Sequence, residues 1–169
     1  MILRLSQRLA RKIQAGPFAE MPSADHPWDD WSCRLFVAQR TEYIIISNTA
    51  SLYSCVMPGQ EIVDPDGFLN RLRYTMGGFF KADQQPHAYQ RLIAAASAGV
   101  TFAKFVDRSV MVSMADHVHG SKLFLSDGLP TNEIGVRLNN TPMRVLMDCA
   151  GRRYARPREV FERLANHQD

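Results

Sequence analysis

The chain has 169 residues, a length that suits one domain with a sizeable core. Its composition, 46% hydrophobic and 22% charged, excludes wholesale disorder, and no apolar run approaches the ~20 residues that a membrane-spanning helix needs. The net charge of +3 gives little support for a polyanionic partner, because acidic residues accompany basic ones in every third of the chain. The three cysteines lack CxxC spacing, which predicts free thiols in a cytoplasmic protein without a metal or other cofactor.

Two interpretations fit the first twenty residues. Residues 2–5 read as a short strand, and in the helical turn that follows Leu5, Leu9 and Ile13 share one stripe. The alternative is an organellar transit peptide, because four basic residues and no acidic residue precede Glu20. The placement of the apolar residues favours docking of this segment on a core.

The segment from residue 33 to residue 57 predicts a meander of three strands, at 33–38, 43–48 and 51–57. A polar tetrad at 39–42 suits the first hairpin loop. Three consecutive isoleucines, Ile44 to Ile46, must place apolar groups on both faces of the sheet. The middle strand is therefore expected to be central, with other elements packed over each face.

Three helices and three further strands are predicted in the rest of the chain. One begins at Asp64-Pro65 and ends near Phe80, after a Gly-Gly pair. Another begins after Asp107 and stops at Gly120, with residues 122–126 either continuing it or forming a strand. The last begins at Pro157. Further strands are expected in the first half of 89–96, at 100–106 and at 134–138. This order predicts a single α+β domain, in which an antiparallel sheet is covered by two or three helices.

The helix predicted at 107–119 carries the group of polar residues that most resembles a catalytic site. Ser113, Asp116 and His117 lie close together on it, so a small hydrolase or transferase with Ser113 as nucleophile is one hypothesis. The alternative is a small polar face packed near a loop, because no strained turn exposes the serine. His117 and His119 point about 200° apart on a helix and cannot share a metal ion.

Two other groups of residues are candidates for binding. Polar side chains gather at the second turn of the meander, where a ligand-binding rim competes with ordinary turn chemistry. The candidate ligand contacts are Asn48, Ser51, Tyr53 and, from the polar helix face, Ser109. The densest basic stretch is the run at 152–158, where arginines with an interleaved tyrosine suit phosphate and base contact. The candidate nucleic-acid contacts are Arg152, Arg153, Arg156 and Arg158; the alternative is a solvated run.

Five stretches resemble a known family: MILRLSQRL at the start, DDWSCRLF, the adjoining QRTEYIIISNTASLYSCVM, DRSVMVSMAD and RPREVF near the end. Together they are similar to an uncharacterised bacterial domain of unknown function, and the resemblance spans residues 1–161. It implies a bacterial protein from a family met on mobile elements such as plasmids or integron cassettes. It supplies no activity, cofactor or catalytic residue.

The sequence thus predicts a cytoplasmic accessory protein that binds a macromolecular partner and can self-associate. Nucleic-acid binding through the arginines at 152–158 is the first alternative, and hydrolysis or group transfer is the second. No contact with a membrane is expected.

Overall fold

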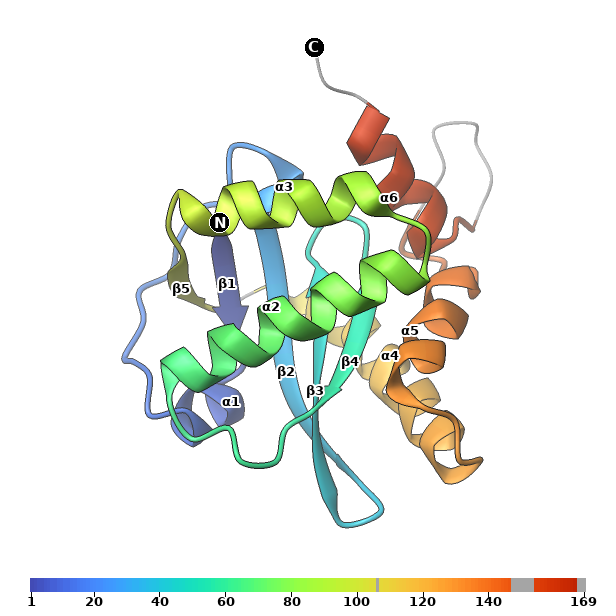
Figure 1. The fold of residues 1–169 in the computed structure, drawn as a ribbon, viewed down its shortest axis with the longest axis horizontal. Helices are drawn as coiled ribbons and strands as arrows, with labels where there is room; N and C mark the ends of the chain where they lie inside the picture. Colours follow the sequence, from blue (N-terminus) through green and yellow to red (C-terminus); the bar gives the residue numbers. More distant parts are fainter. Residues whose placement is uncertain (106, 147–153, 167–169) are drawn as a thin grey trace.

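The computed structural model describes residues 1–105, 107–146 and 154–166, with side chains as far as residue 164. Its centre is a five-stranded sheet with the strand order β4-β3-β2-β1-β5 (Figure 1). The strands are β1 (Ile2–Leu5), β2 (Asp30–Ala38), β3 (Thr41–Asn48), β4 (Ser54–Pro58) and β5 (Thr101–Lys104). The β2, β3 and β4 strands form the predicted antiparallel meander, whereas β1 runs parallel to both β2 and β5.

Helices cover both faces of this sheet (Figure 1). They are α1 (Gln7–Lys12), α2 (Pro65–Ala82), α3 (Pro86–Ser97), α4 (Arg108–Ser126), α5 (Thr131–Asn140) and α6 (Pro157–Asn166). The apolar side chains of α1, α2, α3 and α6 pack together in one core, and those of α4 and α5 pack in the other. The α+β class is confirmed, and the arrangement is a sheet between two layers of helices.

The doubly covered middle strand is also confirmed. Ile44, Ile45 and Ile46 are all fully buried. Ile44 and Ile46 belong to the core under α2 and α3, and Ile45 to the core under α4 and α5. The next strand alternates in the same way, with Val56 in the second core and Cys55 in the first.

Two features of the predicted architecture are wrong. The sheet is mixed, because β1 passes through α1 and a long loop before it pairs in parallel with β2. It also carries more helices than the two or three predicted. Residues 89–96 lie in α3 and residues 134–138 in α5, not in strands. In both segments the buried residues are spaced by four, as in Ala88, Leu92 and Ala96 or in Ile134 and Leu138, which is the spacing of a helical stripe.

Several elements also begin or end at other residues than predicted. Gly120 does not end α4, which continues to Ser126 because Ser121 and Leu125 extend its buried stripe. The first hairpin turn is only Gln39-Arg40, and both residues have the positive φ values that a two-residue turn requires. The third strand begins at Ser54, and the segment before it belongs to the turn.

Two helical glycines give a matched test of this packing. A Cβ at Gly135 would lie 2.7 and 2.8 Å from atoms of the Phe79 ring, whereas a Cβ at Gly78 would meet no atom within 4 Å. We expect Gly135→Ala to lower the free energy of unfolding by about 1–3 kcal/mol through overpacking. Gly78→Ala should raise it by about 0.5–1 kcal/mol through helix propensity. Urea denaturation of both variants checks this, and a stabilised Gly135→Ala protein would contradict the packing described.

Candidate functional site

The polar face predicted on α4 lies against a cavity of about 910 Å³. Ser109, Ser113, Asp116 and His117 all line it, together with residues from the segment that follows α5. Ser113 and His117 are buried, whereas Ser109 and Asp116 are exposed. The structure therefore brings together the four residues that the sequence singled out on this helix.

The hydrogen bonds of these residues do not pair a nucleophile with a base. The Ser113 hydroxyl donates to the backbone carbonyl of Ser109 at 3.0 Å. The His117 ring turns away from Ser113, and its Nδ1 lies 3.0 Å from the hydroxyl of Ser54 on β4. Within the described residues nothing activates Ser113, so the hydrolase hypothesis gains no support from this geometry.

The contacts of Ser54 define the state of His117. The Ser54 hydroxyl lies 2.7 Å from the carbonyl of Leu52, which can only accept, so Ser54 gives its single proton there. The hydroxyl of Ser47, 2.6 Å away, and His117 Nδ1 must then both donate to Ser54. His117 therefore carries a proton on Nδ1. Its buried Nε2 has no partner in the described part of the chain. Burial lowers the pKa of His117 to about 4.

Ser54 also anchors α5 to the sheet. Asn139, which is fully buried, accepts a hydrogen bond from the backbone N–H of Ser54 at 2.7 Å and donates to its carbonyl at 2.9 Å. The Asn139 amide thus takes the place of a neighbouring strand at the edge of the sheet. This contact was not predicted, because nothing in the local sequence indicates which residue an asparagine on a helix will meet.

The candidate ligand contacts at the second turn of the meander are buried inside the protein. Asn48 and Ser51 are fully buried and Tyr53 is 1% exposed. The Asn48 side chain accepts from the backbone N–H and the hydroxyl of Ser51, at 3.0 and 2.9 Å, and donates to the carbonyl of Pro27 at 2.8 Å. The Tyr53 hydroxyl donates to Asp83. Turn chemistry and core packing account for all three residues, and no surface rim is formed by them.

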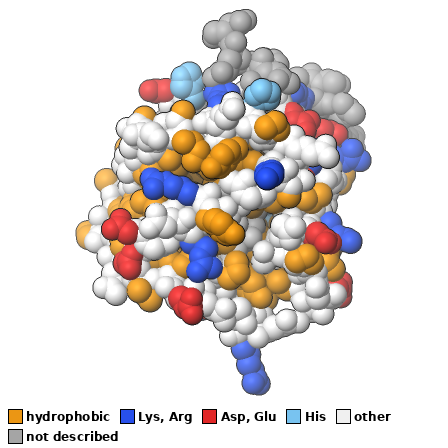
Figure 2. Space-filling view, viewed as in Figure 1, with side chains coloured by type: hydrophobic (Ala, Val, Ile, Leu, Met, Phe, Trp, Pro, Cys, Tyr) orange, Lys and Arg blue, Asp and Glu red, His pale blue; other side chains and the backbone are white. Residues whose placement is uncertain are grey.

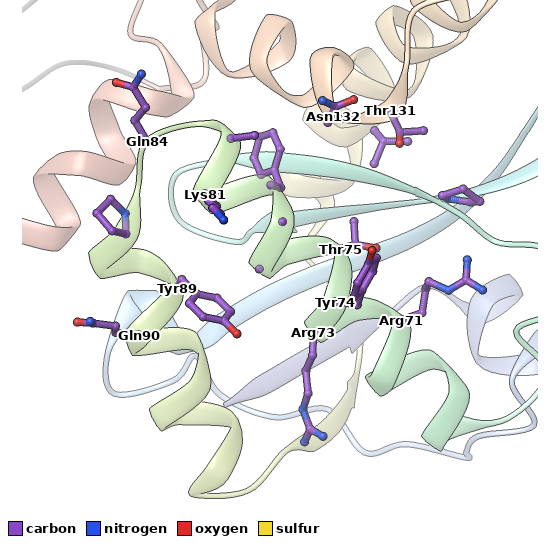
Figure 3. A pocket seen from close by; sticks show the side chains of 17 residues that line it. Arg71, Arg73, Tyr74, Thr75, Lys81, Gln84, Tyr89, Gln90, Thr131 and Asn132 are labelled. Atoms are coloured by element: carbon purple, nitrogen blue, oxygen red, sulfur yellow. The ribbon is translucent and has the colours of Figure 1, made fainter.

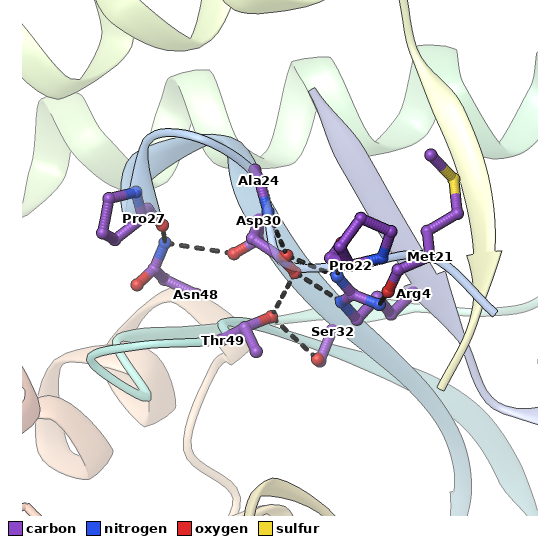
Figure 4. A network of polar contacts seen from close by, with 9 residues as sticks. All are labelled: Arg4, Met21, Pro22, Ala24, Pro27, Asp30, Ser32, Asn48 and Thr49. Carbon is purple, nitrogen blue, oxygen red and sulfur yellow. Dashed lines mark hydrogen bonds and ion pairs between the residues drawn. The ribbon is translucent and has the colours of Figure 1, made fainter. Parts of the chain in front are cut away.

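Asn48 belongs to a larger buried network centred on an ion pair (Figure 4). Arg4 on β1 donates two hydrogen bonds to the carboxylate of Asp30, at 2.8 and 2.7 Å, and both side chains are 5% exposed. Arg4 also donates to the carbonyls of Met21 and Pro22. The hydrogen bond with Asp30 raises the pKa of Arg4, although burial opposes the shift. The network ties β1, β2 and the loop between them together, which is a structural role.

The arginine run divides into three parts. Arg152 and Arg153 lie outside the described residues. Arg156 is exposed and pairs with Glu159 at 3.3 Å, one turn further along α6. Arg158 pairs with buried Asp83, so it docks α6 on the end of α2. The two described arginines are thus engaged within the chain.

A different surface of the protein is both concave and basic. A groove of about 1220 Å³ follows the C-terminal half of α2 and is bordered by the first turns of α3 and α5 and the end of β4 (Figure 3). We call it the α2 groove. Its polar lining residues are Arg71, Arg73, Tyr74, Thr75, Lys81, Gln84, Tyr89, Gln90, Thr131 and Asn132.

The charges of the α2 groove have one sign. Arg71, Arg73 and Lys81 line it, and none of the described residues that line it is acidic. Within the described residues these three cations make no hydrogen bond or ion pair, and Arg73 and Lys81 are exposed. Figure 2 shows the same face, where basic side chains stand among hydrophobic ones over α2 and α3 and acidic side chains lie towards the edges. Such a surface attracts anions.

The local sequence explains how α2 presents this face. Phe68, Leu72 and Met76 turn one side of the helix into the core. Arg71, Tyr74 and Lys81 lie outside this buried stripe and line the groove. One signal in the sequence points to this surface, namely the lack of acidic residues between Asp66 and Asp83.

His117 makes the stability of the fold depend on pH. Its pKa is lowered from 6.5 to about 4 in the folded protein, so the unfolded chain binds more protons between these values. The free energy of unfolding should therefore fall by roughly 2–3 kcal/mol through this residue as the pH drops from about 7 to about 4. Urea denaturation across this range should show a shallower loss for His117→Gln. His119→Gln is an exposed control on the same helix, and its free energy of unfolding should depend on pH as in the wild type. If His117→Gln also shows the wild-type dependence, His117 is not its source.

Metal and thiol chemistry find little support in the described residues. No group of three histidine, cysteine, aspartate or glutamate side chains lies close enough there to hold a metal ion. Cys33 and Cys55 are free and buried, and burial raises the pKa of Cys55 to about 12, which keeps its thiol protonated. Cys149 lies outside the described residues.

No described helix combines the length and apolar character needed to cross a membrane.

The comparisons with known proteins give one match. No curated protein and no solved structure matches the chain. The profile of one family, described as a domain of unknown function (DUF6933), matches residues 2–160. This match covers nearly the whole sequence and confirms the resemblance to a domain of unknown function. The chain therefore belongs to the DUF6933 family.

Proposed function

We propose that this protein is a binding protein whose α2 groove takes up an anionic segment of a macromolecular partner. The observation that carries the proposal is a set of three cations, Arg71, Arg73 and Lys81, that have no partner among the described residues and line a groove without described acidic residues. A protein gains no stability from cations that contact no other group. Their placement in one concave surface instead favours a partner of opposite charge.

The size of the groove fits part of a macromolecule. A volume of about 1220 Å³ exceeds the ~300–1,000 Å³ of ordinary small-molecule sites. Its border is built from four elements that the two cores hold in place, so the cations lie on a rigid support. A preformed site of this kind loses little conformational entropy when its partner binds.

The other predicted functions have weaker support. The arginine run at 152–158 would need free guanidinium groups, but Arg156 and Arg158 already pair with carboxylates. Hydrolysis or transfer would need a base at Ser113, and His117 faces Ser54 instead. Self-association and a cytoplasmic location stay predictions from the sequence.

A charge-reversal experiment tests this proposal. Binding of a labelled oligoglutamate peptide and of a labelled single-stranded oligonucleotide of about 12 nucleotides is measured by fluorescence anisotropy. For any probe that binds, Arg71→Glu combined with Arg73→Glu should weaken binding at least about tenfold, which corresponds to ~1.4 kcal/mol. Both residues lack partners in the described part of the chain, so the variant should fold.

The matched control reverses two cations that lie outside the groove. Arg40 is at the hairpin tip and Lys122 is on α4, and both are exposed. Arg40→Glu with Lys122→Glu changes the net charge by the same amount and should weaken binding much less. The proposal fails if neither probe binds, or if the two double variants lose affinity equally.

A further inference from the structure

We propose that the anionic segment held in the α2 groove is single-stranded nucleic acid, with a base stacked on Tyr74 and phosphates bound by Arg71 and Arg73. This inference rests on the function proposed above and names the chemical class of the partner. It assigns the nucleic-acid contact to α2 and not to the arginine run near the C-terminus.

Tyr74 presents an open aromatic ring among the residues that line the groove. The residue is 83% exposed, and no ring contact or hydrogen bond holds it within the described residues. Figure 3 shows it on α2 near Arg71 and Arg73. Every base has a π face, so an exposed ring beside cations can bind a single strand without regard to its sequence.

Gly78 keeps that ring uncovered. A side chain on a helix leans towards the N-terminus, so a residue at position 78 would cover the turn that carries Tyr74. Apart from the adjoining backbone of α2, no atom lies within 4 Å of the place where a Cβ of Gly78 would be. The surface beside Gly78 is therefore open.

The cations are placed for phosphates on either side of such a base. Arg71 precedes Tyr74 by one turn of α2, and Lys81 lies about one turn beyond Gly78. An arginine can donate two parallel hydrogen bonds to a phosphate. A backbone that runs along α2 would thus meet positive charge before and after the stacked base.

The remaining polar residues of the groove suit base edges. Gln84, Gln90 and Asn132 line it, and each side-chain amide can both donate and accept a hydrogen bond. Single-stranded bases offer donors and acceptors on their free edges. An acidic peptide would satisfy the arginines but has no π face for Tyr74, which is why the structure favours nucleic acid.

Stacking on Tyr74 can be tested by anisotropy with a labelled oligothymidylate of about 12 nucleotides. Tyr74→Ala should weaken binding roughly 5- to 150-fold, whereas Tyr74→Phe keeps the ring and should bind within about twofold of wild type. Tyr154→Ala removes a tyrosine that is 54% exposed outside the groove, and it should have no effect. Gly78→Leu should weaken binding by covering the ring, without lowering the melting temperature.

Two further probes separate this inference from the proposal beneath it. A duplex of the same length should bind more weakly than the single strand, because its bases are already stacked. If the oligoglutamate peptide binds through Arg71 and Arg73 and oligothymidylate does not, the inference is overturned and the proposed function stands. If Tyr74→Ala binds like wild type, or the duplex binds as tightly as the single strand, the inference is also overturned. If neither anionic probe binds, both fail.

Discussion

The burial of β3 on both faces of the sheet is the constraint on which the rest of the structure depends. Ile44 and Ile46 need cover on one side and Ile45 on the other, so helices must pack on each face. Each covering helix turns its apolar stripe inwards and leaves its opposite face to solvent. The outward face of α2 is such a face, and it carries the cations of the α2 groove.

Because both faces of the sheet are buried, the polar residues near it need hydrogen-bond partners inside the protein. The carboxylate of Asp30 is satisfied by Arg4, that of Asp83 by Tyr53 and Arg158, and the hydroxyl of Ser54 by its three neighbours. Leaving any of these groups without a partner would cost about 1–3 kcal/mol or more. Residues that look reactive in the sequence therefore hold the layers together, and binding chemistry is left to exposed side chains without internal partners.

The sequence predicted those parts of the fold that depend on local pattern. The strand pattern identified the meander and its doubly covered middle strand, and the cap at Asp64 correctly located the start of α2. Pairing between distant segments could not be read in this way. The parallel contact of β1 with β2 joins strands that lie about 25 residues apart, and no local signal specifies it. Short apolar runs such as 134–138 fit a strand and a helix equally well, and only packing against β4 decides between them.

The candidate site shows the same limit. Ser109, Ser113, Asp116 and His117 were correctly grouped, since one helix fixes their relative positions. The partner of His117, however, lies on β4, which the sequence does not place. The α2 groove was missed for a related reason. Its residues come from four elements, and only the folded chain shows that Arg71 and Asn132 border one surface.

Nuclear magnetic resonance would test the central claim most directly, namely that partners bind over α2. Backbone amide shifts of the labelled protein are followed while an anionic oligomer is added. We expect the largest changes in α2 from Arg71 to Lys81 and in the first turn of α3, with little change around the cavity beside Ser113. Changes centred on that cavity or on Arg156 and Arg158, or no changes at all, would contradict the account.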